Sequence, residues 1–218
     1  MQQALLGMNL SDVSPADIMS YGWSRDAQQS PSELSNLRTL IREAHTQARE
    51  EGKKFIVVSH SWGTVLSYLA LAHEYAAGNF YCDLFITLSS PLGTPYALAE
   101  YNKPFPNRWE WLGMIFEHFA VLPYTYTWLD NLGVDWDSVN VSLPSNVTWA
   151  HNFWLHGDFI SGPIPESMGF NNYQLDEENP YPRDWLNVWP RHEYTTLKPG
   201  TAIYIQIEAF LNEVITGQ

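Results

Sequence analysis

The sequence predicts an α/β fold in which a mostly parallel central sheet is flanked by helices. Two short runs of buried-strand character support this prediction, Phe55–Val58 and Cys82–Ser89. Between the two runs, apolar residues recur at helical spacing from Val65 to Gly78. Apolar strands that alternate with helices are typical of a parallel sheet covered on both faces. We expect a single domain over residues 1–218, because this length is enough for one sizeable core and short for two.

Three further segments are expected before the first of these strands. Gln2–Met8 resembles the last turns of a helix, and Asp17–Trp23 has the pattern of a strand. Ser30–Gly52 is predicted to be an amphipathic helix, because one apolar face recurs along it and a glycine ends it. Its first four residues, Ser-Pro-Ser-Glu, read as a capping box with proline at the first helical position.

The second half of the chain is expected to return to the sheet. Val147–Trp154 has strand character, and a polar loop over Glu166–Pro182 follows it. Trp185–Trp189 is predicted to be a last short strand. An amphipathic helix that begins near Thr201 closes the chain.

Residues 96–150 interrupt this rhythm with an unusual density of aromatic side chains. An insertion at the carboxyl edge of a parallel sheet lies over the site that such a sheet builds, so this segment is predicted to be a cap. Four of its rings are the candidate walls of an apolar acyl or aromatic pocket: Trp109, Trp111, Phe116 and Phe119. The equally open alternative is that these rings only pack the cap onto the body.

Composition and charge exclude several classes of partner. The formal net charge is −13 with only 11 Lys and Arg, whereas nucleic acids and anionic membranes bind basic patches. Cys82 is the single cysteine, so no intrachain disulfide can form. No apolar run is long enough for a membrane span, and we expect a cytoplasmic protein. We also expect no metal and no cofactor, because no zinc, calcium or phosphate-binding motif is present.

The turn between the first strand and its helix contains the candidate nucleophile. Ser61 stands at the apex, and Gly63 follows where a side chain is expected to collide with the backbone of the preceding strand. A strand, a tight turn and a helix are the context of a nucleophile elbow, which presents a serine hydroxyl above the sheet. The alternative is a serine that merely caps a helix in an unrelated unit.

Two motifs resemble the α/β-hydrolases, in particular their lipase- and esterase-like members. Ser59-His60-Ser61-Trp62-Gly63 is similar to their G-x-S-x-G elbow, with Ser59 in place of the first glycine. The second strand runs into Ser90-Pro91-Leu92-Gly93-Thr94-Pro95, which looks like the loop that follows the nucleophile helix in lipase-like families. The resemblance implies hydrolysis of a small-molecule or lipid ester through an acyl-serine intermediate. An acyltransferase with the same residues and a non-catalytic binding module stay open as alternatives.

The resemblance also implies a catalytic triad in the chain order serine, acid, histidine. Ser61, Asp158 and His192 follow that order, and the backbone N–H of Trp62 is the expected oxyanion donor. Two other carboxylates compete for the role of the acid, Asp176 and Asp184. His60 is the variable residue of the elbow, and the remaining histidines are interpreted as structural or solvated: His45, His73, His118, His151 and His156.

One part of the family pattern is missing before the elbow. The family's His-Gly-type loop, which supplies a second oxyanion N–H, follows a strand that lies beside the elbow strand in the sheet. Residues before Asp17 offer no such strand. We therefore expect that Met1 is a late start or a truncation, and that the sheet lacks its usual neighbour beside Phe55–Val58.

Overall fold

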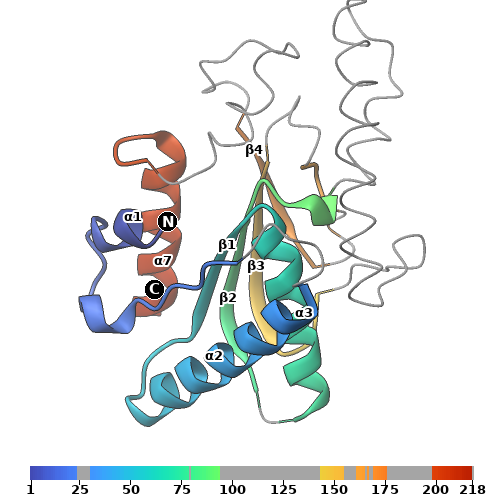
Figure 1. Ribbon diagram of the computed structural model, residues 1–218. Coiled ribbons are helices and arrows are strands. Elements are labelled where there is room, and N and C mark those ends of the chain that lie inside the picture. The colour runs from blue at the N-terminus through green and yellow to red at the C-terminus, as the bar shows by residue number, and fades with distance from the viewer. Residues whose placement is uncertain are drawn as a thin grey trace, which may run out of the picture.

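The structure, a computed structural model, describes residues 1–23, 30–78, 80–93, 143–154, 161–164, 166, 169–175 and 198–217. These residues form a four-stranded, all-parallel sheet with helices on both faces, which confirms the predicted α/β fold (Figure 1). The strands lie side by side in chain order: β1 (Ile56–His60), β2 (Cys82–Leu88), β3 (Val147–Trp154) and β4 (Asn171–Gln174). Within the described residues β1 is therefore an edge strand.

Two pairs of helices cover the sheet. α2 (Ser30–Glu50) and α3 (Trp62–Ala76) lie on one face, and α1 (Gln2–Leu6) and α7 (Ala202–Thr216) lie on the other (Figure 1). We call these the α2/α3 face and the α1/α7 face. Two short 3₁₀ turns complete the described elements, η1 (Pro15–Asp17) and η3 (Pro91–Gly93).

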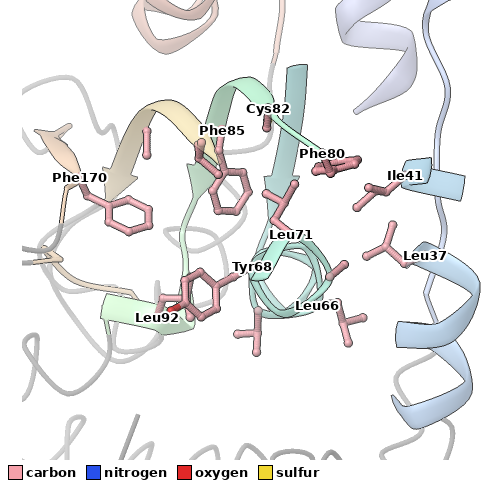
Figure 2. Packing of buried hydrophobic residues seen from close by; sticks show 14 of the residues in the cluster. Leu37, Ile41, Leu66, Tyr68, Leu71, Phe80, Cys82, Phe85, Leu92 and Phe170 are labelled. Atoms are coloured by element: carbon pink, nitrogen blue, oxygen red, sulfur yellow. The ribbon is translucent and has the colours of Figure 1, made fainter. Parts of the chain in front are cut away.

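The side chains of β2 divide the core into two clusters because alternate residues of a strand point to opposite faces. Phe85 points to the α2/α3 face, where it belongs to one cluster with Leu37, Leu66 and Leu71. Figure 2 shows these side chains around α3, with the residues of α2 beyond it. Leu84, Ile86 and Leu88 belong to the other cluster, with residues of α1 and α7. All seven residues of β2 are buried, which explains why its sequence is one continuous apolar run apart from two polar positions.

Most predicted elements are confirmed. The predicted N-terminal helix end is α1, and the two amphipathic helices are α2 and α7. Thr201 caps α7 by accepting a hydrogen bond from the Tyr204 N–H. The predicted strand over residues 147–154 is β3, so its first four residues belong to the sheet although they fall within the segment assigned to the cap. The rest of that cap up to residue 142, and the predicted strand Trp185–Trp189, lie outside the described residues.

The predicted strand at Asp17–Trp23 is wrong. Residues 15–17 form η1, and none of the described residues 18–23 joins the sheet. The Asp17 carboxylate accepts hydrogen bonds from the N–H and the hydroxyl of Ser14, each at 2.7 Å, and this capping closes a helical turn instead of an extended start. Further on, the Tyr21 hydroxyl donates to Glu33 of α2. Side-chain bonds therefore fix this segment in place of strand pairing.

The polar loop predicted over Glu166–Pro182 is wrong in part, because Asn171–Gln174 forms β4. β4 pairs in parallel with the end of β3, with Asn172 opposite Asn152. Its residues show no apolar alternation, so the sequence carries no strand signal there. Pairing with β3 and the side-chain bonds of Asn172 determine the strand.

None of the helices in the described part of the chain combines the length and the apolar character that a membrane span requires.

Candidate active site

Ser61 occupies the turn between β1 and α3 in a conformation that few residues other than glycine adopt. Its backbone has φ 54° and ψ −135°, and it is the N-cap of α3. A side chain at positive φ costs about 1–3 kcal/mol and persists only where the surroundings enforce it. Strain at the apex of a strand–turn–helix unit is the geometry that a nucleophile elbow requires. This turn is the feature that the sequence predicts for Ser61.

Hydrogen bonds hold the backbone of Ser61 on both sides. Its N–H donates to the carbonyl of Leu88 at the end of β2, at 2.9 Å. Its carbonyl accepts from the N–H of Thr64 at 2.9 Å and from the Thr64 hydroxyl at 2.7 Å. Each such bond contributes about 0.5–1.5 kcal/mol, so three of them are of the size needed to offset the strain.

The departure from glycine at the first position of the elbow is accommodated by a partner on α3. The Ser59 hydroxyl donates to the Ser67 hydroxyl at 2.8 Å, and both residues are buried. A buried hydroxyl without a partner would be costly, so Ser67 makes serine acceptable at this position. Strand and helix still approach closely enough for two short side chains to meet.

Gly63 avoids a close contact, but with a different neighbour from the one that the sequence predicts. A Cβ at this position would lie 3.1 Å from Nε1 of Trp23, a contact tighter than ordinary van der Waals packing. The neighbour is thus an indole from the segment before α2 and not the backbone of β1, so the predicted collision with the strand is wrong. The ring of Trp23 lies against the first turn of α3.

Trp62 is the first residue of α3 and has two parts with different surroundings. Its side chain is 2% exposed and belongs to the core of the α2/α3 face. Its backbone lies at the N-terminus of the helix, where N–H groups point out of the helix end and carry its positive partial charge. This placement is compatible with the oxyanion role, which stays a prediction.

The loop after β2 reaches the elbow, a contact that the sequence did not reveal. Ser89 also has positive φ, at 45°, and its N–H donates to the carbonyl of Phe153 on β3 at 3.0 Å. The next hydroxyl, that of Ser90, lies 2.7 Å from the hydroxyl of Thr64, and both residues are 0% exposed. The sequence identified this loop by its motif but gave no signal for the contact, which depends on the register of β1 and β2.

A second buried polar cluster links β2, β3 and β4 on the α2/α3 face. The Asn152 amide oxygen accepts from the Thr87 hydroxyl, and its amide nitrogen donates to the Gly162 carbonyl and to Asn172, all at 2.9 Å. Asn172 in turn bonds both the N–H and the carbonyl of Ile164. These bonds fix the segment 161–164, which begins three residues after Asp158 in the sequence. No local pattern in the sequence predicts this cluster either.

The other predicted site residues, and two of the histidines interpreted as structural, lie outside the described residues. These are Asp158 and His192, the competing Asp176 and Asp184, the pocket candidates Trp109, Trp111, Phe116 and Phe119, and the histidines His118 and His156. The structure therefore describes Ser61 and Trp62 of the predicted site, and their catalytic roles, like the triad itself, stay predictions.

Four histidines are described. His60 ends β1 and His73 is exposed on α3. His45 and His151 are buried, and burial lowers the pKa of both imidazoles. His151 is stacked on Phe210 at 4.5 Å in the core of the α1/α7 face, as expected for a structural histidine. No group of three or more His, Cys, Asp or Glu side chains in the described segments could hold a metal ion.

One comparison with known proteins gives a match. Residues 16–101, less than half of the chain, match the family model of lecithin:cholesterol acyltransferase. Neither a curated protein nor a solved structure matches the chain significantly. The matched residues include α2, β1, the elbow, α3, β2 and η3. The part of the chain that builds the elbow is thus similar to a lipase-like α/β-hydrolase family.

Proposed function

We propose that the protein is a serine hydrolase that cleaves a carboxylic ester, of a lipid or a smaller molecule, through an acyl-serine intermediate. The observation that supports this most strongly is the positive φ of Ser61 at the junction of a parallel strand and a buried helix. A serine that merely capped a helix would have no need of this strain. The similarity of the same residues to a lipase-like family supports the same reading.

The proposed mechanism uses four groups. His192 accepts the proton of the Ser61 hydroxyl as the oxygen attacks the ester carbonyl, and Asp158 fixes the tautomer of the imidazole and stabilises its charged form. The backbone N–H of Trp62 donates to the developing oxyanion. His192 then protonates the leaving alcohol, and water attacks the acyl-serine by the same route in reverse.

The decisive experiment is labelling with a fluorophosphonate probe, followed by peptide mapping. We expect the probe to modify Ser61, and Ser61→Ala to abolish labelling. Hydrolysis of p-nitrophenyl esters should fall by about 10⁴- to 10⁶-fold in Ser61→Ala and in His192→Ala, because members of a triad act as a unit. A folded Ser61→Ala variant with wild-type turnover would refute the proposal. So would a wild-type protein that neither reacts with the probe nor hydrolyses esters, which would favour a non-catalytic binding module.

An acyltransferase is the second candidate, because the matched family is named for acyl transfer. The chemistry differs only in the second step, where an alcohol replaces water as the acceptor. Product analysis with a competing alcohol separates the two functions. A new ester as the main product would indicate the transferase, and free acid at all alcohol concentrations would indicate the hydrolase.

The aromatic segment is proposed to set the choice of acyl group. Burial of apolar surface is worth about 25 cal/mol per Å², so longer acyl chains should react better than acetate if the rings of Trp109 and Trp111 line the pocket. Replacing both by alanine should flatten the dependence of kcat/KM on chain length. An unchanged chain-length profile would show that these rings only pack the segment onto the body.

A further inference from the structure

We propose that Ser90 is a positioning residue for the nucleophile, which it holds through Thr64 by fixing the carbonyl of Ser61. This inference rests on the proposed function. Ser90 acts through Thr64 and not on a reacting atom, and its role is to keep the strained backbone of Ser61 in place.

The direction of the hydrogen bonds follows from counting hydrogens. The Thr64 hydroxyl has one hydrogen, which it donates to the carbonyl of Ser61 at 2.7 Å. Its oxygen must therefore accept in the 2.7 Å contact with Ser90, so Ser90 is the donor. The Ser90 oxygen accepts in turn from the N–H of Leu92 at 3.2 Å. The result is one directed chain from Leu92 through Ser90 and Thr64 to Ser61.

Because these hydrogen bonds are buried, water cannot easily take the place of a lost partner. Thr64 and Ser90 are both 0% exposed, and Leu92 is 1% exposed, so water has little access to the two hydroxyls. Removal of the Ser90 hydroxyl would take away the only described donor to the Thr64 oxygen. Hydrogen bonds in such a series polarise one another, so the loss also weakens the bond from the Thr64 hydroxyl to the Ser61 carbonyl.

The same short segment holds Ser61 from both sides. Leu88 accepts the hydrogen bond of the Ser61 N–H, and Ser90, two residues later, supports the Ser61 carbonyl through Thr64. The two peptide groups that define φ and ψ of Ser61 are therefore both fixed by the end of β2. The N–H of Ser89, between the two supports, is itself bonded to Phe153 of β3. The sheet thus sets the orientation of the nucleophile.

The test compares two variants that interrupt this chain of hydrogen bonds with one that removes a similar hydrogen bond elsewhere. Ser90→Ala removes one hydroxyl, and Thr64→Val removes the other at nearly constant volume. Ser67→Ala is the matched control, because it also deletes a buried serine hydroxyl with a 2.8 Å partner but leaves the Ser61 carbonyl untouched. Thr64→Ser keeps the hydroxyl and should restore what Thr64→Val loses. Thermal unfolding confirms that each variant is folded at the assay temperature.

We expect Ser90→Ala and Thr64→Val to lower kcat for p-nitrophenyl butyrate and the rate of fluorophosphonate labelling by about 10- to 100-fold, since small displacements of a reacting group have effects of this size. KM should stay within about twofold, because the substrate pocket is not altered. Ser67→Ala should lose thermal stability but label at the wild-type rate, and Thr64→Ser should label within about threefold of it.

The outcomes separate this inference from the proposed function. A wild-type protein that the probe does not label overturns the proposed function, and this inference with it. A labelled wild type whose folded Ser90→Ala and Thr64→Val variants react at an unchanged rate overturns this inference alone. If Ser90→Ala does not fold, Thr64→Val and Thr64→Ser decide, because they break and restore the chain from the other end. A Ser67→Ala variant that loses as much labelling as Ser90→Ala also overturns it, because the effect would then be general loosening of the turn.

Discussion

The two faces of the sheet are held by different kinds of contact. On the α1/α7 face, the side chains of β2 meet apolar residues, and Phe153 stacks on Tyr173 at 4.8 Å. On the α2/α3 face, the apolar cluster around Phe85 is crossed by directed polar contacts. These are the bonds Ser59–Ser67 and Thr87–Asn152, and the ion pair of buried Glu74 with Arg38 at 2.8 Å.

Directed contacts occur where particular atoms have to be held in place. Apolar contacts are non-directional and supply stability in proportion to buried area, whereas hydrogen bonds fix particular atoms. The carbonyl of Ser61 is held by Thr64 of α3, and the segment 161–164 is held by Asn152, whose side chain lies on the same face of the sheet. We therefore expect apolar substitutions on the α1/α7 face to lower stability alone, and loss of the polar bonds that hold Ser61 or the segment 161–164 to lower activity as well.

The largest loss of stability is expected on the α1/α7 face. Phe153→Ala should lower the free energy of unfolding by about 3–5 kcal/mol, because it leaves a cavity in a fully buried position. The protein that remains folded should still react with the fluorophosphonate probe at the wild-type rate. Urea denaturation and labelling at low temperature measure the two effects, and Phe153→Leu should show a smaller loss. A labelling rate that falls with stability would show that the two faces are not separable.

On the α2/α3 face, activity should fall together with stability. Asn152→Leu should cost about 2–3 kcal/mol, because the Thr87 hydroxyl and the Gly162 carbonyl lose a partner in the interior. Ester hydrolysis by the folded protein should also fall, because the released segment 161–164 follows the proposed acid, Asp158.

Asn146→Leu is the matched control for this change. Asn146 is also buried, but its side-chain nitrogen makes one long bond, 3.3 Å to the Leu71 carbonyl, and its side-chain oxygen has no partner. Its replacement should cost less and leave hydrolysis unchanged. Equal effects of the two substitutions on hydrolysis would contradict a specific role of Asn152.

Local patterns in the sequence were enough to predict the central unit of the fold. β1, α3 and β2 were visible because a buried parallel strand is a continuous apolar run and a helix repeats at its own period. The elbow was visible because both elements and the motif are contiguous in the chain. The strained φ of Ser61 follows from that arrangement.

Contacts between distant residues could not be predicted in this way. β4 is a strand because it pairs with β3, although its own residues are polar. The neighbour of Gly63 is Trp23, forty positions earlier, and the neighbour of Thr64 is Ser90 in the loop after β2. Each of these contacts depends on how elements pack, which no local pattern records.

A moderate effect is expected at the contact of Gly63 with Trp23. Gly63→Ala should lower stability by about 1 kcal/mol and slow labelling several-fold, because the new methyl group meets the Trp23 indole at 3.1 Å. A double-mutant cycle measures the contact. Trp23→Leu removes the indole, and in that background the further change Gly63→Ala should cost less than it does alone. Additive effects would show that Trp23 is not the group that restricts position 63.

The smallest effect, and the one that compares the faces most directly, concerns two buried histidines. His45 packs 4.4 Å from Phe80 on the α2/α3 face, and His151 packs 4.5 Å from Phe210 on the α1/α7 face. One ring nitrogen of each has no hydrogen-bond partner, Nε2 of His45 and Nδ1 of His151. Burial is the main cause that lowers the pKa of each imidazole. Arg49 lowers the pKa of His45 further, and a nearby carboxylate opposes the lowering in each case, Asp83 for His45 and Glu213 for His151.

The sign of the pH dependence follows from these lowered pKa values. Between the folded pKa and the unfolded value of about 6.5, the unfolded chain binds more protons than the folded protein. The contribution of each histidine to stability is therefore complete above the unfolded value and is lost as the pH falls toward the folded pKa. Each histidine contributes a slope of at most about 1.4 kcal/mol per pH unit in that window. His45→Phe and His151→Phe should each flatten the dependence of the unfolding free energy on pH between about 7 and 5, measured by urea denaturation. His73→Phe controls for the same replacement at an exposed position. A slope that neither buried substitution reduces would show that these imidazoles take up protons as readily in the folded protein as in the unfolded chain.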